Sequence, residues 1–148
     1  MPYAAAVFLL APACATAQVR VSDPWVRATV PQQKISGAFM QLSSSRDARL
    51  VEIRSAVAGA VEIHEMAMDK GVMRMRPVPG VDLPAGRTVE LKPGGYHVML
   101  MDLKQPVTIG ATVPLRLTVE YPDQRRETVE INAAVRALGA SQEPEHKH

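Results

Sequence analysis

Residues 112–135, TVPLRLTVEYPDQRRETVEINAAV, contain two runs in which apolar and polar side chains alternate strictly. Val113, Leu115, Leu117, Val119 and Tyr121 alternate with polar residues or proline, and apolar residues occupy every second position of 129–135. Side chains of a strand point alternately to its two faces, so this period of two indicates strands with one buried and one wet face. Pro122-Asp123-Gln124 between the runs is a turn. The stretch therefore predicts two antiparallel strands of a half-buried sheet.

The rest of the chain has the same character. No long apolar period of 3.6 residues occurs, and proline and glycine interrupt the sequence at short intervals. We expect an all-β fold, an antiparallel β-sandwich or small barrel. The further expected strands are 19–21, 25–28, 36–42, 50–55, 61–68, 72–76, 89–91 and 96–103, with a break at 22–24 and irregular chain across most of 77–87. Trp25 is expected in the core, and Met40 is expected to be structural.

Length and composition limit the possible classes of protein. A chain of 148 residues and 16.1 kDa with 47% hydrophobic residues fits one domain, predicted at 18–136, followed by a flexible tail at 137–148. The net charge is only +2, and neither a basic helix nor interleaved aromatic residues occur. Nucleic-acid binding is therefore not expected.

The N-terminus has features of an export signal. Residues 1–17, MPYAAAVFLLAPACATA, carry no charged side chain and end in an A-x-A pattern, so we expect cleavage after Ala17. A membrane anchor and a lipid attached to Cys14 are the alternatives. Cys14 is the only cysteine, so a cleaved chain contains none and forms no disulfide, in keeping with an oxidising compartment.

Methionine and histidine are concentrated in residues 61–101. This stretch holds six of the eight methionines and two of the four histidines, spaced by two along three expected strands: His64, Met66 and Met68; Met73 and Met75; His97, Met99 and Met101. Each set projects from one face of its strand. Asp69-Lys70-Gly71 is a hairpin loop that folds 61–68 back on 72–76, which places the thioethers on one face and Arg74 and Arg76 on the other.

This residue mixture indicates a soft metal. Thioether sulfur is uncharged and favours Cu(I), and imidazole binds copper in either oxidation state. Without a cysteine thiolate, a blue-copper electron-transfer site is excluded. His146 and His148 in the tail are candidate ligands for a divalent metal such as Cu(II), although a polar terminus without metal is the simpler interpretation.

The spacing of four residues resembles a known family. His64, ten residues, Met75, twenty-one residues and His97-Val98-Met99 are similar to the H(M)X10MX21HXM motif of the periplasmic copper(I) chaperones, the PCu(A)C-like proteins that help assemble the dinuclear copper site of cytochrome c oxidase. GVMRMRPV and PGGYHVMLMDLKQP also resemble that family. Glu65 stands where the motif tolerates a second methionine.

The resemblance implies a cupredoxin-like β-sandwich that holds one Cu(I) through His64, Met75, His97 and Met99. We expect the protein to be a monomer. The resemblance also implies a periplasmic location and a copper acceptor, either oxidase subunit II or another copper chaperone. The expected auxiliary ligands are Met66, Met68, Met73 and Met101, as a rim or during transfer.

Three other classes of function were weighed. An enzyme is not expected, since nucleophile and phosphate-binding motifs are missing and neither histidine has a carboxylate partner by motif. A copper-buffering or resistance protein would bind the same metal without delivering it to an oxidase. A metal-free interaction domain would use the methionines as an adhesive patch.

Overall fold

The computed structural model describes residues 18–137, and all regular structure in this range is β-strand. Between residues 18 and 137 there is consequently no helix able to cross a membrane. The strands are β1 (Val19–Arg27), β2 (Ser36–Ser44), β3 (Ala48–Arg54), β4 (Ala58–Asp69), β5 (Val72–Pro77), β6 (Val81–Leu83), β7 (Thr88–Leu91), β8 (His97–Leu103), β9 (Thr112–Glu120) and β10 (Arg126–Arg136). The all-β prediction is confirmed.

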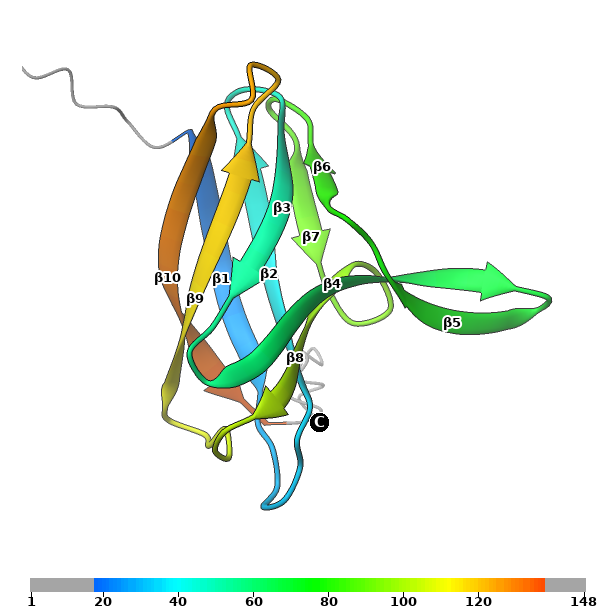
Figure 1. The fold of residues 1–148 in the computed structure, drawn as a ribbon, viewed down its shortest axis with the longest axis vertical. Coiled ribbons are helices and arrows are strands. Elements are labelled where there is room, and N and C mark those ends of the chain that lie inside the picture. Colours follow the sequence, from blue (N-terminus) through cyan, green and yellow to red (C-terminus); the bar gives the residue numbers. More distant parts are fainter. Residues whose placement is uncertain (1–17, 138–148) are drawn as a thin grey trace, which may run out of the picture.

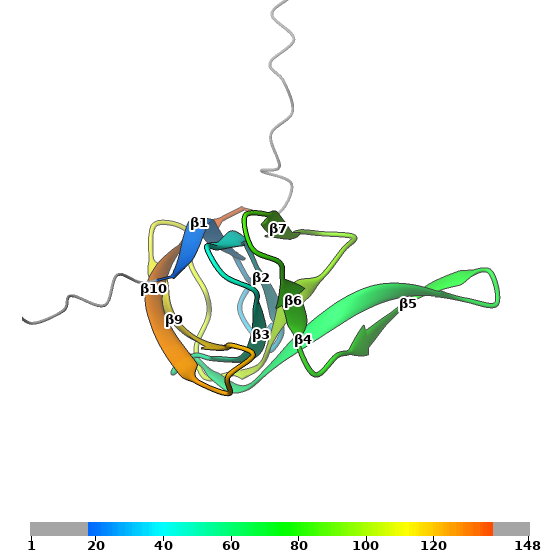
Figure 2. The same cartoon turned by 90° about the horizontal axis from the view of Figure 1, so that it is seen from above.

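The strands form a strongly curved sheet that closes into a barrel-like sandwich, seen end-on in Figure 2. Their order is β5-β4-β8-β2-β1-β10-β9-β3-β6, and β7 pairs with β2 beyond the part of β2 that pairs with β8. Every pairing is antiparallel except β1 with β10. The order places β5, β4 and β8, which carry the methionines and histidines, side by side.

The core forms from the apolar faces that the alternation predicts. On β9, Val113, Leu115, Leu117 and Val119 are each at most 3% exposed, while most intervening residues face water. Burial of one such leucine contributes about 1.5–3 kcal/mol. Met40 belongs to this core, as expected. The sandwich thus has a hydrophobic core to which β4 and β8 also contribute side chains.

Three local predictions are wrong. β1 runs without interruption through 22–24, because Asp23 (φ 49°) absorbs a bulge in its pairing with β2. Trp25 is only half-buried and stacks on Phe39 with ring centroids 4.5 Å apart. Its neighbour Val26 is the core residue, so Trp25 must point to the other face. The third concerns the length of the turn in the 61–76 hairpin, described below. Most of 77–87 is irregular as expected, and β6, a short strand paired with β3, interrupts it.

The hairpin of β4 and β5 leaves the sandwich as an arm (Figure 1). Residues 58–64 of β4 pair with β8, whereas 65–69 pair only with β5. Asp69 pairs with Val72, so the turn consists of Lys70 (φ 48°) and Gly71 (φ 80°), one residue shorter than predicted. Positive φ at both positions defines a type I′ turn, whose twist suits a two-residue hairpin.

The predicted signal, Cys14, and the tail histidines His146 and His148 lie outside residues 18–137, the part that the structure describes.

Candidate metal site

His64 and His97 meet where the arm joins the sandwich. They are direct partners in the β4·β8 pairing, and their ring centroids lie 5.8 Å apart with the planes at 60°. The ring of His97 is almost fully buried (5% exposed), and the His64 side chain is 13% exposed. The pairing of two regular strands therefore holds both imidazoles in place.

Each imidazole has one nitrogen in a hydrogen bond and one without a partner. His97 Nδ1 donates to the carbonyl oxygen of Gly95 at 2.9 Å, and His64 Nε2 donates to Glu62 Oε2 at 2.6 Å. The opposite nitrogens, His97 Nε2 and His64 Nδ1, are buried and make no hydrogen bond. A buried polar atom without a partner is costly, and a neutral imidazole nitrogen carrying a lone pair is a metal ligand. The two free nitrogens fit a soft or borderline metal ion.

The thioethers surround this pair on the same sheet face. Met99 pairs with Glu62, which places it diagonally across from His64. Met75 pairs with Met66 and is the other diagonal neighbour of His64, across β5. Diagonal neighbours are about 7–8 Å apart, within reach of long side chains. The pairing thus brings the four predicted ligands into one neighbourhood.

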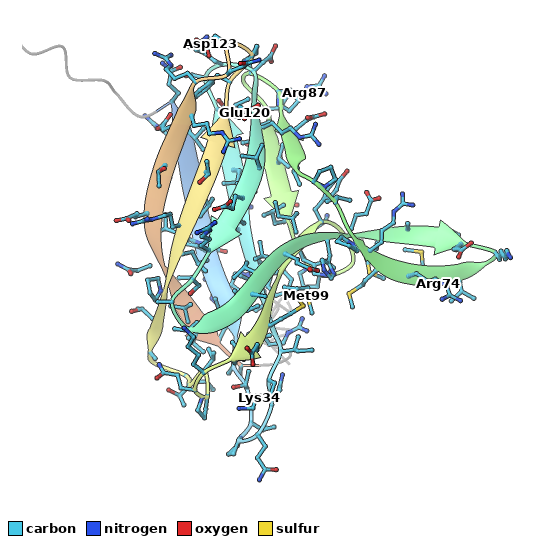
Figure 3. All side chains as sticks on the ribbon, in the orientation of Figure 1. Lys34, Arg74, Arg87, Met99, Glu120 and Asp123 are labelled. Carbon is cyan, nitrogen blue, oxygen red and sulfur yellow. The ribbon has the colours of Figure 1, made fainter. Side chains whose placement is uncertain are left out.

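An open groove of about 560 Å³ exposes three of the four predicted ligands, Met75, His97 and Met99, to solvent, and His64 is not part of its lining. Met66, Met75, His97 and Met99 line one side of it. The rest of the lining comes from the turn before β8, and from the end of β1, the loop that follows it and the start of β2: Pro93, Gly94, Arg27, Gln32, Gln33, Lys34, Ile35, Ser36, Gly37 and Phe39. Figure 3 shows Met99 beneath the root of the arm, with Lys34 on the neighbouring loop.

Gly37 contributes to the shape of the groove. It pairs with Met99 on β8, and a Cβ atom at this position would lie 2.9 Å from Phe39 Cζ. The missing side chain lets the Phe39 ring lie over the strand.

The remaining methionines lie farther from the histidines. Met68 pairs with Met73 toward the end of the arm, and Met101 pairs with Ala60, one step beyond Met99. None of these three lines the groove.

No carboxylate partner was predicted for either histidine, but Glu62 is a partner of His64. The residues directly adjacent to the histidines point to the opposite strand face. Glu62 stands two positions before His64 and shares its face. The contact holds the His64 ring and keeps its proton on Nε2, a role that carboxylates commonly fill behind metal-binding histidines.

The available donors favour a soft cation. Within residues 18–137, no group of three or more His, Cys, Asp or Glu side chains is placed to hold a metal, and the donors beside the two imidazoles are thioethers. Thioether sulfur suits Cu(I), whereas calcium and magnesium need oxygen ligands.

Comparison with known proteins identifies the family of this chain. Residues 19–135 match the LpqE-like family. Lxx21020 of Leifsonia xyli subsp. xyli (strain CTCB07), named as a lipoprotein, is 33% identical over 100 residues, which cover 67% of this chain and 60% of that protein.

Two solved structures place the fold. The copper-bound PCuAC domain from PmoF2 is 26% identical with a TM-score of 0.67, over 82% of this chain and 95% of that one. CuI-DR1885 from Deinococcus radiodurans is 30% identical with a TM-score of 0.56, over 78% of this chain and 75% of that one. The predicted cupredoxin-like fold and the resemblance to the PCu(A)C-like proteins are confirmed. The chain belongs to the LpqE-like family and has the fold of the PCuAC domains.

Proposed function

We propose that this protein is an exported copper chaperone. It binds one Cu(I) ion through His64, Met75, His97 and Met99 and delivers the ion to an acceptor protein. The observation that carries the proposal is the pair of buried, unpartnered nitrogens, His64 Nδ1 and His97 Nε2, on adjacent strands beside two thioethers.

The donor set supports a carrier of Cu(I). Two neutral imidazoles and two thioethers add no charge to the monovalent ion, and soft sulfur favours Cu(I) over Cu(II). The copper-bound PCuAC domain from PmoF2 and CuI-DR1885 share this fold at 26% and 30% identity, which supports the same cargo here. The role we propose is carriage, without catalysis.

The unequal exposure of the ligands suggests how the ion is transferred. His97 is 5% exposed and mounted on the sandwich, while Met75 is 52% exposed on the arm. An acceptor approaching the groove can displace Met75 first, since that thioether is already open to solvent. The histidines then release the ion to incoming ligands one at a time, so free copper is never set loose.

The acceptor and location follow from the family resemblance. We propose the dinuclear copper site of cytochrome c oxidase, on subunit II or through another copper chaperone, as the destination, and the periplasm as the location. The lipoprotein name of Lxx21020 supports export. Cleavage after Ala17, an uncleaved membrane anchor and a lipid on Cys14 are the three forms of the exported chain to be distinguished.

A Cu(I) competition titration against a chromogenic chelator tests the cargo. The wild type should bind one tight equivalent, which a His64→Ala, His97→Ala double variant loses. Met75→Leu and Met99→Leu should bind more weakly, because leucine keeps the volume and removes the sulfur. Met40→Leu is the matched control, since Met40 lies in the core. Equal affinity in all three leucine variants would contradict the ligand assignment.

Delivery needs a separate experiment. The loaded protein is mixed with the soluble copper domain of an oxidase, and metal occupancy of both partners is followed. Transfer supports the chaperone, while retention of tightly bound copper indicates the buffering protein instead.

A further inference from the structure

The arm carries four methionines whose arrangement goes beyond the four-ligand site. The amide of Val78 donates to the carbonyl oxygen of Ile63 at 2.9 Å. Hydrogen-bonded and non-hydrogen-bonded pairs alternate along an antiparallel ladder. Counting from the 63/78 pair, Met66/Met75 and Met68/Met73 are both non-hydrogen-bonded pairs. These are the pairs whose side chains lie closest, with Cα atoms about 4.5 Å apart.

Both pairs occupy one face of the arm, and charged side chains occupy the other. Glu65 pairs with Arg76, whose Nε lies 2.7 Å from Glu65 Oε1. Arg74 Nε lies 3.6 Å from Asp69 Oδ2. Figure 3 shows Arg74 toward the end of the arm. The arm is therefore a ribbon with ion pairs on one side and two rows of thioethers on the other.

Core packing does not account for these methionines. Met75 is 52%, Met73 49% and Met68 68% exposed, and their stretch of the arm pairs with no strand of the sandwich. Exposed apolar side chains on a two-stranded ribbon contribute little stability. What distinguishes these methionines from other apolar residues is the thioether sulfur, a soft metal ligand.

The two pairs extend outward from the proposed copper site. Met66 and Met75 line the groove with His97 and Met99, and Met68/Met73 is the next pair on the same face. Successive pairs are about 7 Å apart along a strand, a gap that two flexible thioether side chains can narrow. Soft donors thus continue from the groove toward the solvent-exposed end of the arm.

We propose that Met68 and Met73 form a second, weaker site for a soft monovalent ion, and that Cu(I) leaves the primary site through Met66/Met75 to this outer pair. The passage through the arm rests on the proposed function. At each step one Cu–S bond forms as another Cu–ligand bond breaks, and copper stays Cu(I), so no electron donor or acceptor is needed.

The test uses Ag(I), a redox-stable soft ion, and ¹³C-methyl-methionine NMR of the full chain. In the wild type the first equivalent should shift the Met75 and Met99 methyl signals, and further Ag(I) should shift those of Met68 and Met73. Met40, buried in the core, is the internal reference. Unmoved Met68 and Met73 signals in excess Ag(I) would overturn the second site.

Two variants separate this site from the primary one. Met68→Leu, Met73→Leu keeps the arm apolar and should lose the second equivalent while keeping the first; a retained second equivalent contradicts the assignment. In the His64→Ala, His97→Ala variant, Ag(I) should still shift the Met68 and Met73 signals. If these shifts disappear, they depend on binding at the primary site and Met68 and Met73 form no separate site. A wild type with shifts at Met68 and Met73 but none at Met99 would contradict the proposed function and leave the outer site standing.

The rate of Cu(I) transfer to an acceptor tests whether the ion leaves through the arm. The Met68→Leu, Met73→Leu variant, loaded with one Cu(I), should transfer it to the oxidase copper domain more slowly than wild type. Equal transfer rates would mean that Met68 and Met73 bind the ion but take no part in its transfer, and would overturn the proposed passage through the arm.

Discussion

Removing the Glu62 carboxylate should weaken Cu(I) binding without unfolding the protein. Glu62 Oε2 accepts the His64 Nε2 proton at 2.6 Å, which keeps Nδ1 free for the metal. A hydrogen bond to a charged group contributes about 1.5–3 kcal/mol. The Glu62 side chain is 45% exposed, so solvent screening reduces this to about 1–1.5 kcal/mol. Glu62→Ala should therefore raise the Cu(I) dissociation constant about tenfold. This is the lower end of the about 10–100-fold loss of affinity seen when a residue that hydrogen-bonds a metal ligand is replaced.

The matched control is the neighbouring glutamate. Glu65 lies on the same strand but on the opposite face, where it pairs with Arg76. Glu65→Gln changes the same charge and should leave Cu(I) affinity close to wild type. Glu62→Gln retains an oxygen acceptor but loses the charge, so its affinity should fall between wild type and Glu62→Ala.

Competition titration measures the affinities, and ¹⁵N NMR of the metal-free protein reports the position of the ring proton. His64 should be protonated on Nε2 in wild type and in Glu65→Gln, and should become a mixture of tautomers in Glu62→Ala. Equal loss of affinity in the Glu62 and Glu65 variants would refute the reasoning, because the effect would then be general electrostatics. An unchanged His64 tautomer in Glu62→Ala would refute it as well.

Four further predictions concern stability. Burial, together with the hydrogen bond to Glu127, raises the pKa of Tyr121 to about 12, so the folded state keeps a proton that the unfolded state releases near pH 10. Stability present below pH 10 should therefore fall as pH rises to about 12, by about 1–2 kcal/mol once solvent screening is included. Urea titrations should show this slope and its loss in Tyr121→Phe. Leu117→Ala should cost about 2–5 kcal/mol in the same assay, because Leu117 is fully buried. Replacing a buried tryptophan by alanine lowers the free energy of unfolding by about 3–5 kcal/mol. Trp25→Ala should lower it by less, since Trp25 is only half-buried. Gly71→Ala should speed hydrogen exchange in the arm and leave the sandwich amides unchanged, because Gly71 has a φ of 80° outside the core.

Alternation made the fold predictable. β9 and β10 obey the two-residue period over their whole length, and each has one face in the core. The same period predicted that the methionines of the arm share a face opposite Arg74 and Arg76, as the pairing shows. Periodicity works here because strand side chains alternate whatever the strand packs against.

The incorrect predictions arose where tertiary pairing overrides local sequence. Proline and aspartate at 23–24 indicated a break, but pairing with β2 and β10 carries β1 across a bulge. Trp25 was expected inside because of its size; the position of Val26 in the core decides its side. Glu62 shares the predicted face of His64, but their hydrogen bond depends on the two side-chain conformations, which the two-residue period does not give.

The position of the proposed site would allow one fold both to hold and to release an ion. His64 and His97 are fixed by pairing between β4 and β8, and each ring is anchored by a hydrogen bond on its far nitrogen. Met75 belongs to an arm whose outer part rests on no third strand, and such a ribbon has low local stability. In the site that we propose, the two fixed donors would keep the ion localised while the exposed donor exchanges with ligands from the solvent side. A site built wholly inside the sandwich would bind as well but would have to open its core to release copper, which is why we expect the methionines on the arm, more than the histidines, to set the rate of transfer.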